Sequence, residues 1–550
     1  MNRIIILTVV SLFFAFSAFS LAAQKTYHVN IQKGNDSNNG LTWSAAFKNI
    51  QSAIDIAEAG DNILIAEGTY HPTKKIAEIY GGQPDPDKLT GDRHRTFFIQ
   101  ENVKIYGGFP ANATNTTTMS SRNWQLYQTI LSGDFNNNDG EQFENMQENA
   151  FHVIVLLNAS PLLDGLYITG GYANDVSSLY PDEGRTYITG SDGGGIHAYS
   201  PITESSPILN DVTFFGNFAG TAGGAMYNYS PTREVSPKMT NVSFIHNKAE
   251  TGHGGALYSR GDQDTYAELS NVQAIGNESQ KSGGGLYFIA GHQCAPKIIN
   301  TVVSGNYSRG GNGGGIFIGT YYGDAQPEII NATICGNKVG DAYGFDGGGL
   351  VIFPYGLCKA NIFNTVIWGN QGTQFDNFYA EGTLGSQNTI AASLIEGYDA
   401  PGLANLPGNT NPLFLSPVSP NFAPTTNGDY QLTLASPLIN KGINEHVTLP
   451  VDILHHQRIF GNIVDIAAYE SQGTPPVDND ILPEAKSVWA NNGSLYVRIN
   501  HPSTLRVYSP NGLLIKHIRL LDEGMYTYPL PKGIYIVTIN NKPSEKIIIH

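Results

Sequence analysis

One column of aromatic side chains could bind a ligand by stacking. Its five rings recur at intervals of 29 to 31 residues, each directly after the aliphatic residue that follows a glycine run. They are His197, Tyr227, Tyr258, Tyr287 and Phe317. Planar rings at such intervals could stack against sugar faces if the repeats pile up, or they could stack on one another and only stabilise the fold. The sequence leaves both interpretations open.

Oxygen-bearing side chains crowd into the segment D-F-N-N-N-D-G at residues 134–140. Asp134, Asn136, Asn138 and Asp139 have spacings similar to those of a calcium-binding loop, whose ligands are carboxylate and amide oxygens. The glycine comes one place late, and no glutamate stands at the twelfth position. These four residues are therefore candidate calcium ligands, and we expect no other cofactor.

A catalytic set of residues is harder to find. Gly252-His253-Gly254 matches the letters of the G-H-G element of polygalacturonase-type enzymes, but it lies in a glycine corner that every repeat has. A hydrolase would need two carboxylates at one cleft, and a lyase would need a basic side chain beside acidic calcium ligands. The carboxylates near the glycine corners do not recur in register: Asp192, Asp262, Asp264, Asp324, Asp341 and Asp346. We expect His253 to be a turn residue and these carboxylates to be solvated loop charges, so the catalytic residues are unknown.

The elements that must position these side chains are six units of about 30 residues, in region 193–370. Each unit opens on a glycine run and closes on an asparagine. The runs begin at Gly193, Gly223, Gly254, Gly283, Gly313 and Gly347, and the closing residues are Asn217, Asn247, Asn277, Asn306, Asn337 and Asn370. A period of this length is typical of stacked units that bury their apolar faces only against neighbours.

Aligning the copies separates core positions from turn positions. Inward apolar side chains are predicted directly after each glycine run and at eight and three residues before each closing asparagine. Six residues before the closing position lies a second polar column: Asp211, Asn241, Asn271, Asn300, Asn331 and Asn364. Such residues can bond along the stack and tolerate the left-handed turn conformation. Together these columns predict an all-β protein, a right-handed parallel β-helix.

The flanking segments complete the organisation. Residues 1–23 have the layout of a signal peptide, with an apolar run from Ile4 to Phe19 before small residues. The β-helix is expected to span 24–471, with a capping helix within residues 46–59. A linker at 472–485 then leads to a small antiparallel β-sandwich at 486–550, in which a Pro510-Asn511-Gly512 turn joins two strands.

Composition narrows the possible partners. Three cysteines in 550 residues cannot form a disulfide framework. A formal net charge of −16 argues against nucleic acid and anionic membranes as partners. No segment after the signal peptide is apolar enough to span a bilayer.

The repeats resemble the GGA-plus-aliphatic and F-x-x-N motifs of polymorphic outer-membrane proteins. The carrying residues are Gly223-Gly224-Ala225-Met226 with Phe214-Phe215-Gly216-Asn217, and Gly254-Gly255-Ala256-Leu257 with Phe244-Ile245-His246-Asn247. Later copies have Val303, Ile334 and Ile367 at the Phe position, so the likeness concerns the shape of the coil.

Residues 25–470 resemble exported right-handed β-helix proteins of Bacteroidota that end in a choice-of-anchor type Q region, here 360–470. This likeness is carried by the segments 60–70, 103–109, 364–370 and 428–440 and by the ending V-D-I-A-A-Y-E at 464–470, where Ala467 replaces the usual Gly. The family implies no common catalytic activity.

The last domain resembles C-terminal sorting domains of type IX secretion substrates, through residues 505–512, 530–537 and 546–549. This resemblance implies that the type IX secretion machinery is a partner and that the chain is extracellular or on the cell surface.

The sequence therefore predicts a surface-displayed, non-enzymatic binding or adhesin-like protein that recognises polysaccharide or a host surface glycan. Two alternatives stay open. One is a polysaccharide lyase or glycoside hydrolase on a pectin-lyase-like scaffold, and the other is a structural surface rod.

Overall fold

The computed structural model describes residues 23–75, 92–175, 178–179, 188–340, 347–399 and 403–473, and most of 488–549 apart from its loops. Residues 1–22 of the predicted signal peptide, most of the predicted linker, the 510–512 turn, Asp341 and Asp346 lie outside the described residues. The chain divides into two compact units, Met1–Thr474 and Pro475–His550.

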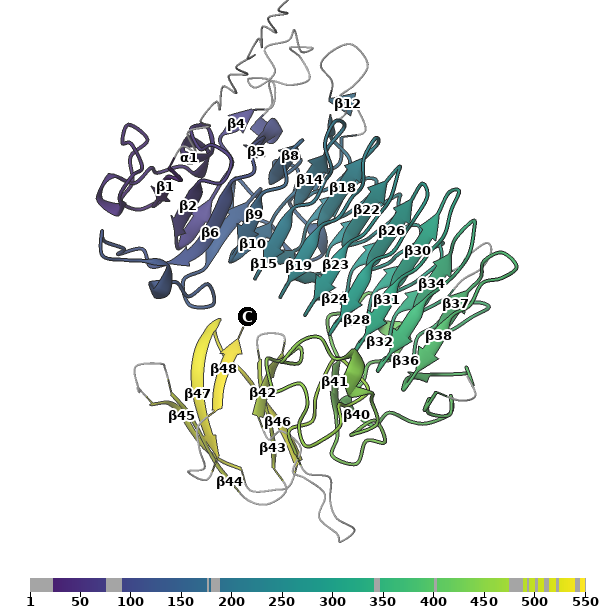
Figure 1. Cartoon of the computed structure of the whole chain (residues 1–550). Helices are drawn as coiled ribbons and strands as arrows, with labels where there is room; N and C mark the ends of the chain where they lie inside the picture. Colours follow the sequence, from purple (N-terminus) through teal and green to yellow (C-terminus); the bar gives the residue numbers. More distant parts are fainter. Residues whose placement is uncertain are drawn as a thin grey trace, which may run out of the picture. The chain divides into compact units, whose positions relative to one another are not determined.

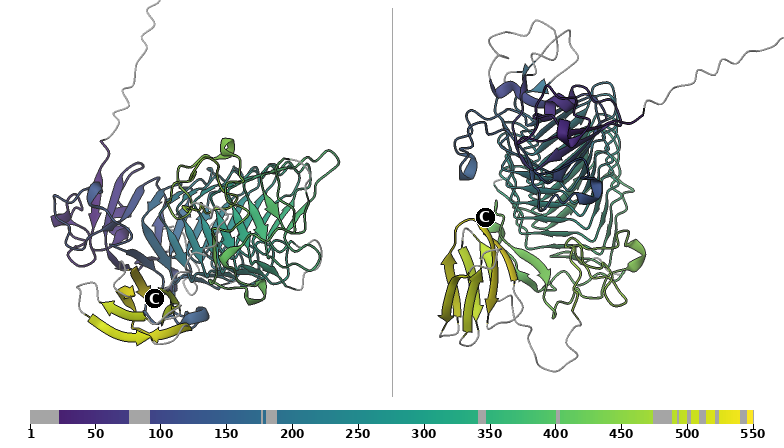
Figure 2. Two further views of the ribbon diagram at one scale, coloured as in Figure 1. Left: turned by 90° about the horizontal axis from the view of Figure 1, so that it is seen from below. Right: turned by 90° about the vertical axis from the view of Figure 1, so that its left-hand side faces the viewer.

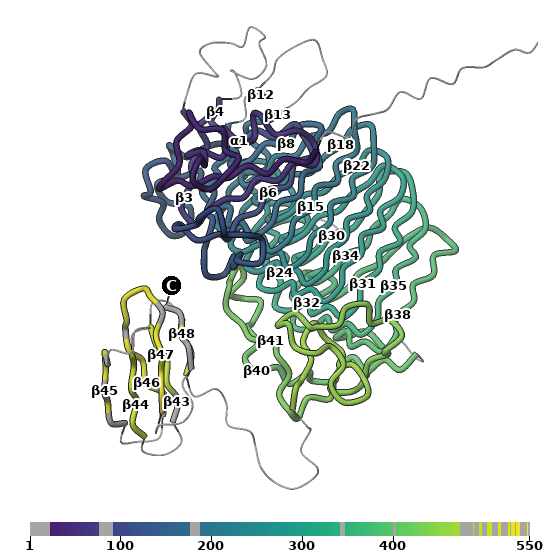
Figure 3. Tube along the Cα trace, turned by 60° about the vertical axis from the view of Figure 1, so that its left-hand side comes forward, coloured from purple at the N-terminus to yellow at the C-terminus, as the bar shows by residue number. Residues whose placement is uncertain are grey.

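The first unit is a parallel β-helix, in which successive coils lie side by side in chain order (Figures 1 and 3). Each regular coil contributes one strand to each of four sheets, and the chain visits them in the order sheet 3, sheet 1, sheet 2, sheet 4. Sheet 1 has eleven strands: β1 Thr26–Val29, β2 Asn62–Ala66, β6 Lys104–Phe109, β9 Leu162–Asp164, β15 Ile208–Asn210, β19 Lys238–Thr240, β23 Glu268–Ser270, β27 Lys297–Ile299, β31 Glu328–Ile330, β35 Asn361–Phe363 and β38 Thr389–Ala391.

The other three sheets run along the same stack. Sheet 2 has ten strands: β3 Gly68–Tyr70, β7 Thr129–Ser132, β10 Leu166–Thr169, β16 Thr213–Phe215, β20 Ser243–Ile245, β24 Gln273–Ile275, β28 Val302–Ser304, β32 Thr333–Cys335, β36 Val366–Trp368 and β39 Leu394–Ile395. Sheet 3 also has ten: β4 Lys74–Lys75, β5 Arg95–Ile99, β8 Ile154–Leu157, β14 Ile196–Tyr199, β18 Met226–Ser230, β22 Leu257–Gly261, β26 Leu286–Ala290, β30 Ile316–Thr320, β34 Leu350–Phe353 and β37 Phe378–Ala380. Sheet 4 has six short strands: β11 Tyr172–Ala173, β17 Phe218–Ala219, β21 Lys248–Ala249, β25 Glu278–Ser279, β29 Tyr307–Ser308 and β33 Lys338–Val339. All strand pairs in these four sheets are parallel except β4 with β5.

The predicted inward columns form one continuous core. The residues after the glycine runs, from Ile196 to Leu350, are fully buried, as are pairs such as Leu209 with Phe214 and Ile329 with Ile334. Successive residues of a strand alternate between faces, so one apolar residue per strand is enough to line the interior of every coil.

Both polar columns lie at turns, as predicted. Asn277, between sheets 2 and 4, donates from Nδ2 to Asn306 Oδ1 at 2.9 Å and accepts from the Asn247 amide at 3.0 Å. The Asp211 column, between sheets 1 and 2, has φ between 49° and 57° at all six positions. Glycine is needed at Gly255, where a Cβ would lie 2.2 Å from the carbonyl oxygen of Gly284 in the next coil. Strands of only three residues can stack closely because the polar and glycine columns fix the backbone at the turns between the sheets.

The N-terminal end of the stack is covered by a short cap (Figure 2). Its α-helix, α1, covers only Ile50–Ile54, after the 3-10 turn η1 at Trp43–Ala45, so the helix expected within 46–59 is shorter than predicted. Beyond the helix, the Glu58 amide donates to the Asp61 carboxylate at 3.0 Å and so does not continue the helical hydrogen bonds. The apolar residues Phe47 and Ile50 are buried, as the helical spacing predicted.

Residues 403–473 form an irregular layer against the later coils, with one small hairpin of β40 Phe414–Ser416 and β41 Asp429–Leu432. The turn asparagines hold it: Nδ2 of Asn300 donates to Val451 O at 2.6 Å, and Nδ2 of Asn364 donates to Ile443 O at 3.0 Å. The layer has its own buried charge cluster around Arg458, which is 1% exposed and lies 3.8 Å from Glu470. The later residues of the Asp211 column thus bind the 403–473 layer, whereas the earlier ones form hydrogen bonds with each other.

The remaining short elements lie in connections. They are the antiparallel pair β12 Ser178–Leu179 and β13 Ile188–Thr189 and the 3-10 turns η2 Asp92–His94, η3 Met119–Ser121, η4 Glu141–Phe143, η5 Pro420–Phe422 and η6 Asn444–His446. No helix within the described ranges is long and apolar enough to cross a membrane.

The second unit consists of two antiparallel sheets around one core, as predicted for a small β-sandwich. One sheet is β42 Val488–Asn491, β43 Ser494–Ile499 and β46 Gly524–Pro529, and the other is β45 Leu514–Leu520, β44 Ser503–Tyr508, β47 Gly533–Ile539 and β48 Glu545–Ile549. Leu495, Val507, Val537 and Ile547 of the two sheets meet in the shared core.

Candidate functional site

The aromatic column on sheet 3 is a closed stack. Tyr258 lies between Tyr227 and Tyr287, with ring centroids 5.1 Å apart on both sides and planes within 9° of parallel. Phe317 continues the stack at 4.9 Å from Tyr287. Tyr258, Tyr287 and Phe317 are only 5–8% exposed. Neighbouring rings therefore cover each other's faces, which is the geometry of a structural ladder and leaves no face for a sugar.

Two histidines extend this ladder and one covers it. His197 is fully buried, 5.2 Å from Tyr227 and 5.0 Å from His152, whose pKa is lowered to about 3 by burial and the adjacent His197. His253 lies over Tyr287 at 4.5 Å, and burial lowers its pKa to about 4. His253 is thus a neutral ring packed on the ladder, in keeping with the turn role expected for it.

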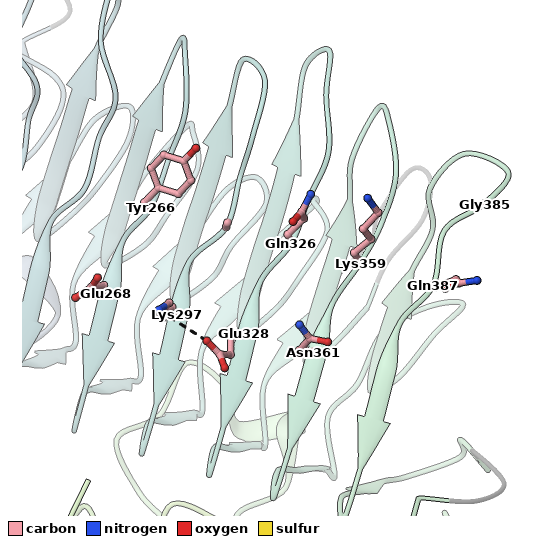
Figure 4. A pocket seen from close by; sticks show the side chains of 10 residues that line it. Tyr266, Glu268, Lys297, Gln326, Glu328, Lys359, Asn361, Gly385 and Gln387 are labelled. Carbon is pink, nitrogen blue, oxygen red and sulfur yellow. Dashed lines mark ion pairs between the residues drawn. The ribbon is translucent and has the colours of Figure 1, made fainter. Parts of the chain in front are cut away.

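The outer face of sheet 1 carries an open polar groove with a volume of about 610 Å³ (Figure 4). Two columns of side chains line it: one in the chain that leads into each strand, and one two residues later, at the first residues of the strands. The first column is Tyr266, Ala295, Gln326, Lys359 and Gln387, and the second is Glu268, Lys297, Glu328 and Asn361. The strands β23, β27, β31 and β35 hold the second column in register.

Charges alternate along the second column. Lys238 pairs with Glu268 at 3.4 Å, and Lys297 pairs with Glu328 at 4.0 Å. These four side chains are 36–56% exposed, so water screens the pairs and each contributes little stability, about 0–1 kcal/mol. Within the groove, two lysines balance two glutamates, and Gln326, Asn361 and Gln387 add amides that can both donate and accept.

The turns from sheet 3 to sheet 1 carry two exposed aromatic side chains a few residues before the groove residues. Tyr322 is 74% exposed and Tyr355 is 71% exposed, on adjacent turns four residues before the groove residues Gln326 and Lys359. Figure 4 shows the turns that precede the strands on which the groove side chains lie. We call Tyr322 and Tyr355 the aromatic lip.

The loop carboxylates near the glycine corners serve as local acceptors. Asp264 accepts the Gln293 amide at 2.9 Å, Asp324 accepts the Leu357 amide at 2.8 Å, and Asp192 accepts the Ala222 amide at 2.9 Å. Asp262 binds Arg260 at 2.7 Å and the Tyr229 hydroxyl at 2.9 Å. Each of these described carboxylates therefore has a hydrogen-bond partner on its own turn or the adjoining coil.

The predicted calcium segment forms a carboxylate cluster of different membership. Asp134, Asp139 and Glu148 place ligand oxygens within 4.8 Å of one another. Asn136 and Asn138 have exposed side chains, and the backbone amide of Asn138 donates to Asp134 at 3.2 Å. The sequence therefore identified two of the three carboxylates.

The groove was missed in the sequence, although a signal exists. The position immediately before the first inward residue of each sheet 1 strand reads Lys238, Glu268, Lys297, Glu328 and Asn361 through five successive coils. Alternating signs in register predict an exposed ladder of ion pairs. Glu148 was missed for another reason, because it lies 14 residues after Asp134, outside any loop of fixed spacing.

Comparison with known proteins gives structural neighbours only. No family model matches the sequence, and no curated protein matches it. Pectate lyase Pel9A is similar over 82% of this chain and 97% of its own, with 14% identity and a TM-score of 0.40. A rhamnogalacturonan lyase covers 67% of this chain and 87% of its own (14% identity, TM-score 0.37), and XylC in complex with xylose covers 82% and 99% (10% identity, TM-score 0.30).

Proposed function

We propose that this chain is a non-enzymatic, polysaccharide-binding protein whose site is the groove on sheet 1 together with the aromatic lip. The observation that carries this proposal is the register of the groove. Polar side chains repeat on four adjacent strands, about 4.8 Å apart, and so form a ladder of hydrogen-bonding groups for an extended chain. A linear polymer can make the same kind of contact at each rung.

The charges favour a neutral polysaccharide over an acidic one. A net charge of −16 repels polyanions at long range, and the two groove lysines are offset by two glutamates. Amides and hydroxyls of the groove suit sugar hydroxyls, which need both donors and acceptors. Tyr322 and Tyr355 can stack on the apolar faces of sugar rings because their own rings are exposed.

Binding is favoured over cleavage by the state of the groove carboxylates. Glu268 and Glu328 are each paired with a lysine of the neighbouring coil and lie in open, hydrated surface. Catalytic acids and bases usually lie in buried settings or beside an unpaired charge, whereas both of these side chains are at least 36% exposed and each lies beside a lysine. A lyase or hydrolase remains the alternative that the experiment below distinguishes.

The location follows from the terminal segments. The N-terminal 23 residues are expected to direct export, and the C-terminal unit is proposed to act as a type IX sorting domain that brings the β-helix to the cell surface. In this arrangement the host or neighbouring glycans are the natural partners of the groove.

A glycan array with parallel detection of released products tests the proposal. We expect retention of one class of neutral polysaccharide without new reducing or unsaturated ends. Release of such ends would assign the groove to an enzyme, and retention of acidic polysaccharides alone would contradict the charge argument. Binding to none of the glycans would favour the second alternative, a structural surface rod.

A further inference from the structure

The connection from β7 to β8, residues 133–153, contains a second site, distant in sequence from the groove. Asp134 is buried, and its two carboxylate oxygens accept the amides of Asn138 at 3.2 Å and Asp139 at 3.1 Å. This turn brings Asp139 back beside Asp134, where Glu148 completes a set of three carboxylates within 4.8 Å. Carboxylates this close repel one another unless a proton or cation lies between them.

Asn149 supplies an independent indication of a missing ligand. It is 0% exposed, and its Nδ2 donates to both carboxylate oxygens of Asp139, at 2.8 and 3.1 Å, and to Gly170 O at 2.9 Å. Three acceptors around Nδ2 fix the orientation of the amide, and two of them belong to Asp139 of the cluster. Its Oδ1 and the buried Oε1 of Glu148 have no hydrogen-bond partner among the described residues. Buried oxygens without a partner are rare in folded proteins, and both of these are acceptors, so the missing partner is electropositive.

Arg93 lies near enough to Glu148 for their charges to interact, but its hydrogen bonds go to oxygens outside the cluster. Arg93 directs its guanidinium to Asn149 O at 2.7 Å, Tyr172 O at 2.8 Å and Asn174 Oδ1 at 2.6 Å. Its hydrogen bonds therefore go to carbonyl oxygens and order the surrounding chain.

We propose that Asp134, Asp139, Glu148 and the Asn149 Oδ1 bind a calcium ion. All four ligands are hard oxygens, which suit calcium or magnesium and not zinc. Two oxygens on opposite sides of a calcium ion lie about 4.6–5.2 Å apart, so oxygens within 4.8 Å can close around it with small side-chain shifts. Irregular geometry from a loop and a mixed carboxylate and amide set fit calcium better than the strict octahedron of magnesium.

The position of the loop indicates what the ion would stabilise. Phe143, inside the same connection, stacks on His246 at 4.9 Å and packs against Phe218 at 5.8 Å, both in the regular coils. A calcium ion would fix the two ends of this insertion, Asp134 and Glu148, so that Phe143 stays on the coils. The site is therefore structural and independent of polysaccharide binding.

The test is calcium titration of the EDTA-treated full chain by calorimetry, with thermal unfolding measured in parallel. We expect one calcium per chain, with a Kd near or below about 1 mM, and a rise in Tm that magnesium at the same concentration does not reproduce. Asp139→Asn with Glu148→Gln should weaken binding at least about tenfold, whereas Glu144→Gln, an exposed carboxylate of the same connection outside the cluster, should bind as the wild type does.

Three results would overturn the proposal. They are no heat and no Tm shift up to about 10 mM calcium, unchanged binding by the double variant, and magnesium binding as tight as calcium. If the double variant does not fold, proteolysis of the wild type decides, because calcium should slow cleavage within residues 135–147 and an unchanged cleavage rate contradicts the site. Loss of calcium should leave glycan retention unchanged. The calcium site and the groove can therefore be contradicted independently of each other.

Discussion

Substituting Tyr287 by alanine separates the aromatic ladder from the aromatic lip. Tyr287 is 5% exposed and has rings at 5.1 Å, 4.9 Å and 4.5 Å, from Tyr258, Phe317 and His253. Removing a buried aromatic side chain loses on the order of 150 Å² of apolar burial, about 4 kcal/mol at ~25 cal/mol per Å², and measured costs for such changes are about 3–5 kcal/mol. We therefore expect Tyr287→Ala to lower stability by about 4 kcal/mol.

The assay is amide hydrogen exchange of the β26 and β30 strands, with urea unfolding followed by circular dichroism. Opening free energies at these amides should fall by the same amount, because each coil is supported by its neighbours. Tyr287→Phe should be nearly neutral, since the column already contains Phe317. Tyr322→Ala is the matched control: its ring is 74% exposed, so stability should change by less than about 0.5 kcal/mol while glycan retention falls. Lost retention with unchanged stability in Tyr287→Ala would refute the ladder.

Three further changes test the turns and the buried charges. Asn277→Ala should cost about 3 kcal/mol in urea unfolding, because it leaves the Asn247 amide and the Phe244 carbonyl without a partner in a fully buried column; a loss below about 1 kcal/mol would contradict the ladder of asparagines. Arg458→Met should cost about 3–5 kcal/mol, because it leaves three buried carboxylates facing each other, and thermal unfolding that matches the wild type would show that the arginine is dispensable. Burial, with the charge of Asp465, raises the pKa of Glu470 from 4.5 to about 7, so its contribution to stability is fully present below pH 4.5 and is lost as the pH rises through 7, a change of roughly 3 kcal/mol. Glu470→Gln should flatten that part of the stability profile, and an identical profile in the variant would argue against the shifted carboxyl group.

The repeat predicted the coil in detail because the equivalent residues of each column meet one structural requirement, such as burial of a side chain or a turn. Leu209 and Phe214 recur where a strand must bury a side chain, and Asn241 recurs where the chain must turn with positive φ. These requirements recur in every regular coil, so an alignment of the repeats reveals the positions that meet them. The cap was predicted less well, because α1 occurs only once among the described residues and no aligned copy shows where it should end.

The site could be predicted only in part, because it depends on exposure and on contacts between segments. The ring of Tyr258 is on the outer face of its strand, yet adjacent rings cover it, and no single repeat contains that information. Tyr322 and Tyr355 lie in turns of irregular sequence, so alignment did not separate them from other loop residues. Glu148 joins Asp134 only because the intervening chain folds back.

The central claim, that the groove on sheet 1 holds a neutral polysaccharide, is tested most directly by binding of a groove variant. The variant combines Tyr266→Ala, Gln326→Ala and Lys359→Ala, and its control is Lys33→Ala, an exposed lysine elsewhere. Calorimetry with the polysaccharide retained on the array should show at least about a tenfold loss of affinity in the groove variant and none in the control. Wild-type affinity should change by less than about twofold between low and high salt, because the ligand is uncharged. Wild-type binding by the groove variant, or affinity that collapses in salt, would contradict the account.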